Sequence, residues 1–214
     1  PTTYAGKDIP SGTIDLVDGS KIILDKNASV VVDPFSKKIR KVNLNGKAYF
    51  EVAPDQTKPF IVESGSTLTE VVGTAFTINA SDQLTKIFVT NGKVIFKSLA
   101  KGVDAIALTA GEAAQYKDGK IERIVNPSPN YNAWQTNQLS FVNMPLSDVI
   151  TDVADYFKRE IVIENEGSKY CRISIARFKE PQFESVLKAI ALSIDAEFVL
   201  EGNKCIIRGG RNCQ

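Results

Sequence analysis

The chain has 214 residues, 43% of them hydrophobic and 24% charged, and its formal net charge is +1. This composition is that of a soluble globular protein with room for two ordinary domains or one large β domain. It excludes the strongly positive surface of a nucleic-acid-binding protein, and no apolar stretch approaches the roughly 20 residues of a membrane-spanning helix.

The first part of the chain has the pattern of short β-strands. Residues from about 13 to 125 alternate between apolar and polar side chains and are interrupted by turn pairs such as Asn91-Gly92. Alternation with period two is typical of half-buried strands, and Asn-Gly is a strong hairpin signal because both residues tolerate a positive φ. We therefore expect an all-β domain over residues 1–126, a β-sandwich or β-roll of about ten strands.

Within this domain, the stretch from Gly46 to Ser64 predicts a strand, a corner and a second strand. Alternation places Phe50 in the core and Tyr49 on the opposite, partly solvated face. Pro59 cannot donate a backbone hydrogen bond, so it ends the first pairing and delivers Phe60 into the next strand. These aromatic residues are therefore interpreted as a sheet corner rather than as the floor of a sugar pocket.

The densest basic run lies in the same domain and contains Lys37, Lys38, Arg40 and Lys41. Because the surrounding residues alternate as in a strand, we interpret this run as a solvated strand face rather than a phosphate-binding track.

The spacing of apolar residues changes after the proline-rich segment that follows Asn126. We assign residues 127–136 to a linker. Beyond it, apolar residues recur with helical spacing after Pro145 and again after Pro181, and strand-like runs flank both helices. The order is β-α-β-β-α-β-β, which predicts a small α+β domain over residues 137–214.

Residues suited to catalysis are scarce. The chain contains no histidine, which removes the commonest general base and metal ligand, and it has no glycine-rich phosphate loop. Paired carboxylates remain the only route to hydrolysis, and the candidates are Glu51, Glu63, Glu70 and Glu112. On alternating strands such acids usually face water, so we predict no enzymatic activity and no cofactor or metal.

The three cysteines are Cys171, Cys205 and Cys213, and they lack the C-x-x-C spacing of a zinc site. Cys205 and Cys213 flank a Gly-Gly pair and could close a small disulfide loop in an oxidising compartment. Three free thiols are an equally weighted alternative.

The order of motifs in the first domain resembles the periplasmic region of FecR-type anti-sigma factors. The segments that carry the resemblance are Asp18–Ser20, the strand ending at Leu24, Gly46–Val52, Lys58–Val62, Val72–Phe76, Asn91–Val94 and Leu108–Glu112. The family pattern usually has an acidic residue after the glycine where this chain has Lys47, a difference that concerns surface charge. Residues 139–146 and the two helices resemble the C-terminal domain of FecR proteins of Bacteroidota, which is similar to the short N-terminal domain of secretins and TonB-dependent transducers.

The resemblance implies a non-enzymatic signalling function. FecR proteins bind an extracytoplasmic-function sigma factor through a cytoplasmic segment, cross the inner membrane once, and receive a signal in the periplasm from the N-terminal signalling domain of an outer-membrane transducer. The chain opens at Pro1 without Met or an apolar signal region, so we expect it to be the periplasmic fragment of such a protein, anchored by an N-terminal helix outside it. A carbohydrate-binding or structural envelope β-protein is the alternative.

We expect the partner to bind the C-terminal domain by strand addition, because small β-α-β domains expose sheet edges. The candidate edge strands are Cys171–Arg177 and Lys204–Arg208, and their candidate partner-binding residues are Cys171, Arg172, Ile173, Ser174, Lys204, Ile206 and Arg208. The alternative is that these two strands pair with each other.

Overall fold

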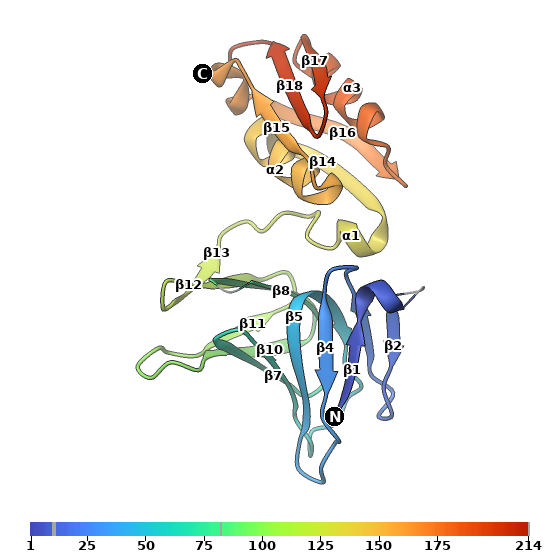
Figure 1. Cartoon of the computed structure of the whole chain (residues 1–214). Coiled ribbons are helices and arrows are strands. Elements are labelled where there is room, and N and C mark those ends of the chain that lie inside the picture. Colours follow the sequence, from blue (N-terminus) through green and yellow to red (C-terminus); the bar gives the residue numbers. More distant parts are fainter. Residues whose placement is uncertain (10–11, 82, 214) are drawn as a thin grey trace. The chain divides into compact units, whose positions relative to one another are not determined.

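The computed structural model describes residues 1–9, 12–81 and 83–213 (Figure 1). Contacts divide the chain into two units, Pro1–Pro127 and Ser128–Gln214. Each unit has its own hydrophobic core. The first unit is built from strands and the second from strands and helices, which confirms the predicted fold class.

Among the described residues, the first unit contains thirteen strands. They are β1 (Thr2–Ala5), β2 (Thr13–Asp15), β3 (Lys21–Leu24), β4 (Ser29–Val32), β5 (Arg40–Glu51), β6 (Phe60–Ser64), β7 (Thr67–Val71), β8 (Ala75–Ala80), β9 (Leu84–Asn91), β10 (Lys93–Ser98), β11 (Ile106–Thr109), β12 (Ala113–Lys117) and β13 (Lys120–Ile124), with a 3-10 turn, η1 (Gly6–Asp8), after β1.

The long strand β5 belongs to two sheets. Its first half pairs with β4 and β6, in the order β1-β4-β5-β6-β7-β10-β11. Its second half pairs with β3 and β8, in the order β2-β3-β5-β8-β9-β12-β13. The strand passes from one sheet to the other at Gly46, where φ is +92° and a Cβ would lie 2.9 Å from atoms of Ala28. Only glycine fits there without strain.

The predicted corner between Phe50 and Phe60 is confirmed. Both side chains are fully buried, and Phe50 stacks on Phe76 with the ring centroids 5.0 Å apart. The carbonyl of Pro59 accepts a hydrogen bond from the backbone N–H of Arg40 at 3.0 Å. The chain therefore turns at Pro59 and enters β6 parallel to the first half of β5.

Arg40 corrects the interpretation of the basic run, because its side chain is only 2% exposed. Its Nη1 donates to Oδ2 of Asp18 at 2.7 Å and to the carbonyl of Ala53 at 2.9 Å, and its Nε donates to the carbonyl of Lys58 at 2.9 Å. The guanidinium also lies over the ring of Phe60, 5.5 Å from its centroid. Buried charge persists here because a carboxylate and two carbonyls compensate it.

The second unit has the predicted order β-α-β-β-α-β-β, with two short additions. Its elements are α1 (Ala133–Thr136), β14 (Gln138–Pro145), α2 (Leu146–Phe157), β15 (Glu160–Ile163), the 3-10 helix η2 (Glu166–Tyr170), β16 (Arg172–Lys179), α3 (Phe183–Ser193), β17 (Ala196–Glu201) and β18 (Lys204–Gly209). The strands form two sheets, an antiparallel pair β14-β16 and a three-stranded sheet β15-β18-β17.

Helices α2 and α3 pack their apolar faces into the core of this unit. The buried residues of α2 recur every three or four positions, as do those of α3, as the sequence predicted. Residues 128–136, which the sequence suggested as a linker, instead belong to the second unit. Their polar side chains bond to β14 and α2, and residues 133–136 form α1.

Candidate partner-binding site

The two-stranded sheet of the second unit has one buried face. Leu139 and Phe141 of β14 and Ile173 of β16 are buried in the core. The register shifts between Leu139 and Phe141 and again between Phe141 and Met144. These irregularities keep Leu139, Phe141 and Ile173 on the core face, and most of the exposed side chains of the two strands are polar or charged.

The exposed side chains of β16 are strongly basic. Arg172, Arg177 and Lys179 are all exposed, and none of them forms an ion pair with a residue that the structure describes. Val142, at the irregular part of β14, is 73% exposed. This sheet therefore presents uncompensated positive charge together with an apolar side chain.

The three-stranded sheet also carries basic side chains, but Lys204 and Arg208 of β18 both have acidic partners. Lys204 lies 3.3 Å from Glu160, and Arg208 lies 3.1 Å from Glu164 and 3.9 Å from Glu201. These pairs join β18 to both of its neighbours and neutralise its charge.

The structure contradicts one of the two predicted edge strands. β18 is the central strand, because Ile206 is opposite Val162 of β15 on one side and Val199 of β17 on the other. Lys204, Ile206 and Arg208 therefore do not lie at an edge. The short turn after Glu201 predicts the antiparallel pairing with β17, but the parallel pairing with β15 joins residues more than forty positions apart and leaves no local signal.

The other predicted edge strand, β16, pairs with β14 alone among the described strands, so its second edge is open. Of its four candidate residues, Arg172 and Ser174 are exposed, whereas Cys171 and Ile173 are buried. Cys171 precedes the strand and ends η2. The hydroxyl of Ser174 already accepts from the backbone N–H of Asn143 at 2.9 Å, whereas Arg177 and Lys179, later in the same strand, are exposed like Arg172.

The free edge of β14 is covered at Ser140, near the start of the strand, by a side chain. The amide of Asn130 accepts a hydrogen bond from the backbone N–H of Ser140 at 2.8 Å and donates to the carbonyl of the same residue at 2.9 Å. This pair of hydrogen bonds imitates the main-chain bonds of a neighbouring strand. Asp152 of α2 holds the amide in place at 2.8 Å and also accepts from the hydroxyl of Ser128 at 2.6 Å.

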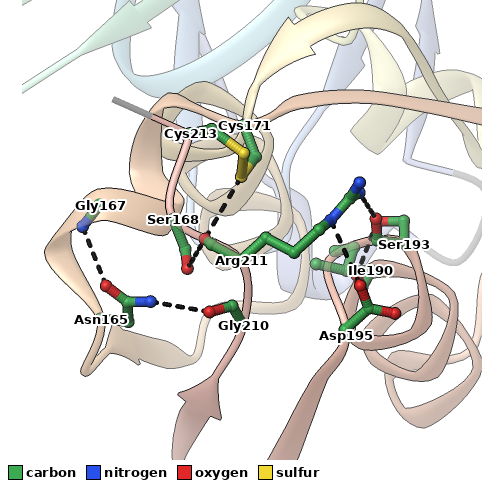
Figure 2. Close-up of a disulfide and its surroundings, with 10 residues drawn as sticks. All are labelled: Asn165, Gly167, Ser168, Cys171, Ile190, Ser193, Asp195, Gly210, Arg211 and Cys213. Atoms are coloured by element: carbon green, nitrogen blue, oxygen red, sulfur yellow. Dashed lines mark hydrogen bonds and ion pairs between the residues drawn. A yellow bond between two sulfur atoms is a disulfide. The ribbon is translucent and has the colours of Figure 1, made fainter.

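The disulfide joins Cys171 to Cys213, with Cα atoms 5.0 Å apart, so the predicted Cys205–Cys213 bond is wrong (Figure 2). Cys205 is free and fully buried on the central strand β18, and burial raises the pKa of its thiol to about 11. Its side chain belongs to the buried cluster of the second unit. Sequence spacing favoured the nearer pair because it cannot show which cysteine faces inward.

The disulfide ends a strap of residues 210–213 that lies against η2 and the end of α3 (Figure 2). The carbonyl of Gly210 accepts from Asn165 at 2.8 Å, and that of Arg211 accepts from the hydroxyl of Ser168 at 2.6 Å. The Arg211 side chain reaches Asp195 at 3.4 Å and also donates to the carbonyl of Ser193. Because Cys171 immediately precedes β16, the strap fixes the start of the basic strand.

Three of the acids considered for hydrolysis form ion pairs with basic residues. Their partners lie on neighbouring strands, as Lys41–Glu63, Lys97–Glu70 and Arg123–Glu112. Within residues 1–9, 12–81 and 83–213, no cluster of three or more acidic or cysteine side chains could hold a metal ion. None of the helices in the described part of the chain combines the length and apolarity needed to cross a membrane.

Comparisons with known proteins match both units. The family model described as FecR protein matches residues 10–95, and the one described as FecR, C-terminal, matches residues 138–207. Two crystal structures of a candidate anti-sigma factor from Parabacteroides distasonis, at 1.65 Å and 2.50 Å resolution, are similar to the whole chain. Among curated protein sequences, none matches this chain.

The first of these structures has a TM-score of 0.70 and 25% sequence identity, and the alignment covers 99% of this chain and 100% of the other. The second has a TM-score of 0.68 and 25% identity, with 98% and 99% covered.

Proposed function

Because this chain belongs to the FecR family, we propose that it is the periplasmic signal-receiving region of a transmembrane anti-sigma factor. In this proposal, an N-terminal helix anchors the whole protein in the inner membrane, and a cytoplasmic segment binds an extracytoplasmic-function sigma factor. The periplasmic region, which this chain forms, receives the signal from the N-terminal signalling domain of an outer-membrane TonB-dependent transducer. It catalyses no reaction.

The observation that carries this proposal is the open, basic edge of β16. A partner strand can add to that edge through main-chain hydrogen bonds, which supply affinity with little demand on side chains. Arg172, Arg177 and Lys179 then select a partner strand with acidic side chains, because each of them lacks an acid of its own. Val142 offers an apolar contact on the same sheet.

A receiver needs two states that the partner distinguishes, because a ligand shifts an equilibrium only by its differential affinity. The segment Ser128–Asn130 is suited to this purpose. It begins where the first unit ends, and it bonds directly to β14 of the receiving sheet. In the proposal, a partner that binds β16 strengthens or weakens the hydrogen bonds between β14 and this segment. The conformation of the chain that leads to the first unit changes as a result.

The test is a calorimetric titration of the whole chain with the N-terminal signalling domains of transducers encoded beside its gene. We expect saturable binding of one of them. The triple variant Arg172→Glu, Arg177→Glu, Lys179→Glu should weaken that binding at least tenfold, because each change replaces attraction by repulsion.

The matched control changes three exposed lysines of the first unit, Lys101→Glu, Lys117→Glu and Lys120→Glu, and alters the net charge equally. It should bind within twofold of the unchanged chain. Equal losses in both variants would show that bulk charge, not β16, governs binding. No loss in either would place the surface elsewhere, and no binding of any transducer domain at tens of micromolar would overturn the receiver function.

A further inference from the structure

A pocket of about 310 Å³ lies in the first unit, beside the outer strands β1 and β2, where the two sheets end. It is lined by β1, the outer strand of one sheet, by residues at the end of β2, the outer strand of the other, and by residues at the end of β4. Its volume is at the lower end of the range of small ligand pockets. The pocket belongs to a different unit from β16, and the inference drawn from it is independent of the proposed function.

The apolar walls of the pocket rest on the core. Tyr4, Leu16, Val32 and Phe35 line it and also pack against the buried cluster of the first unit. The ring of Phe35 meets the fully buried ring of Phe60 edge to face, with centroids 6.0 Å apart. These walls are therefore preformed, and an entering group would not need to order them.

Val17 lines the same pocket and is the most exposed large apolar residue in the described part of the chain, at 96%. It immediately precedes Asp18, whose carboxylate is fixed by Arg40 and Ser20. The hydrogen bonds of Asp18 therefore fix the backbone position of Val17 at the pocket, although the side chain of Val17 is in solvent. A ligand that covers this side chain would remove apolar surface from water, which favours binding.

The side chains that line the pocket carry a negative charge, and the terminal amine of Pro1 is the one positive group beside them. Asp15 and Asp33 line it, and no lysine or arginine does. The carboxylate of Asp33 forms no hydrogen bond or ion pair with any residue that the structure describes. Lys41, whose carbonyl accepts from the backbone N–H of Asp33, directs its amine to Glu63 at 2.9 Å instead.

Asp15 has only a distant and solvated partner, Lys21 at 3.9 Å, with both side chains more than half exposed. A pair of this kind contributes little and is readily exchanged for another cation.

We propose that this pocket binds a basic, apolar peptide segment of a partner protein. One bulky apolar side chain of the segment enters against Tyr4 and Phe35 and covers Val17. A neighbouring lysine or arginine of the segment pairs with Asp33 and Asp15. The outer strands β1 and β2 lie beside the pocket and offer main-chain bonds to an extended segment. The chemistry is opposite to that of β16, which favours an acidic strand.

The probe that tests this is the peptide Lys-Leu-Phe-Lys with both ends blocked, titrated into the ¹⁵N-labelled whole chain and followed by amide chemical shifts. We expect saturable shifts centred on Tyr4, Val17 and Val32. The peptide Glu-Leu-Phe-Glu should produce none, because its charges repel those of the pocket. Binding of the basic peptide should weaken at least fivefold in Asp33→Asn and in Val17→Ser, neither of which removes a bond that the structure contains.

Asp104→Asn is the matched control, because it removes an exposed acid of the same unit that does not line the pocket. It should bind the basic peptide within twofold of the unchanged chain. The proposal is overturned by an absence of saturable shifts at these amides, by equal binding of the acidic peptide, or by Asp33→Asn binding as tightly as Asp104→Asn. Equally tight binding of butylammonium would show a site for small cations instead. Shifts that depend on the concentration of the chain alone would show self-association.

Discussion

A partly buried aspartate stands at the centre of a polar cluster in each unit, and the two clusters differ in what surrounds it. Asp18 in the first unit lies 2.7 Å from the guanidinium of Arg40 and also accepts from Ser20. Asp152 in the second unit accepts hydrogen bonds from two neutral groups, the hydroxyl of Ser128 and the amide of Asn130. No cation pairs with it among the described residues.

The difference determines the sign of the pKa shift. Burial raises the pKa of both carboxyls, but hydrogen bonds from Arg40 and Ser20 outweigh it at Asp18 and hold its pKa below the ordinary value. At Asp152 burial prevails over its two hydrogen bonds, and the pKa is raised. The ionised carboxylate of Asp18 therefore stabilises the folded state, because a cation pairs with it. The ionised carboxylate of Asp152 destabilises the folded state at neutral pH, because its neutral donors do not offset the cost of burial.

The largest expected effect comes from removing the cation of the first cluster. Arg40→Met leaves Asp18 without its counter-ion and two carbonyls without donors, and should lower the free energy of unfolding of the first unit by about 3–5 kcal/mol. Native-state hydrogen exchange of the β5 and β6 amides measures this loss. Arg123→Met, which removes an exposed ion pair and an exposed hydrogen bond to the carbonyl of Ala107 in the same unit, should cost less than about 1 kcal/mol. Similar losses of stability in both variants would show that the buried ion pair of Arg40 contributes no more than an exposed one.

The next effect separates the units, because the described disulfide lies wholly in the second. Reduction of Cys171–Cys213 opens a loop with a sequence separation of 42, and should lower the free energy of unfolding of that unit by about 3–4 kcal/mol. Trp134, the only tryptophan, reports unfolding of the second unit in urea by its fluorescence.

The first unit contains no cysteine, so its hydrogen exchange should be unaffected by reductant. The effect of reductant should also persist in Cys205→Ala, which removes the buried free thiol and leaves the disulfide intact. Loss of the effect in that variant would show that Cys205, not Cys171, pairs with Cys213.

A smaller effect tests the neutral donors around Asp152. Asn130→Ala removes both bonds to Ser140 and one to Asp152, and should cost about 2 kcal/mol. Exchange of the Ser140 amide should become much faster, because the described residues offer it no acceptor other than Asn130. Asn203→Ala, which removes a single long bond of 3.5 Å at the surface, should leave stability within about 0.5 kcal/mol. An unchanged Ser140 amide in Asn130→Ala would show that the edge of β14 is protected in another way.

The smallest effect lies in the pH dependence, where the two aspartates should act in opposite directions. The folded-state pKa of Asp18 is lowered, so its contribution is present above 3.8 and is lost as pH falls through the folded pKa. The folded-state pKa of Asp152 is raised, so its contribution is present below 3.8 and is lost as pH rises through the folded pKa. At pH 7, Asp152→Asn should therefore stabilise the second unit and Asp18→Asn should destabilise the first.

Urea unfolding of both variants between pH 3 and 7 measures these differences, and both should shrink toward the acid end of the range. An Asp152→Asn variant that is less stable than the unchanged chain at pH 7 would show that the charged form of Asp152 is favoured by the fold.

The candidate site was accessible from sequence only in part. The basic character of β16 and the strand itself are visible in Arg172–Lys179, because alternation and charge are local. The role of Asn130 was not visible, because a short proline-rich segment has the composition of a linker whether or not its side chains bond to a strand. No sequence signal distinguishes an asparagine that imitates a strand from one that faces water.

The sequence by itself determined the order of strands and helices in the second unit, the burial of Phe50 and Phe60, the turn at Pro59 and the membership of the FecR family. Each depends on residues close together in the chain, whose period and turn chemistry are fixed locally. Only the tertiary structure decided that Arg40 is buried, that β18 is central, and that Cys213 bonds to Cys171 rather than Cys205. These depend on which distant segments pair and in which register, because a charge, a strand edge or a thiol is buried or open according to its neighbour in space.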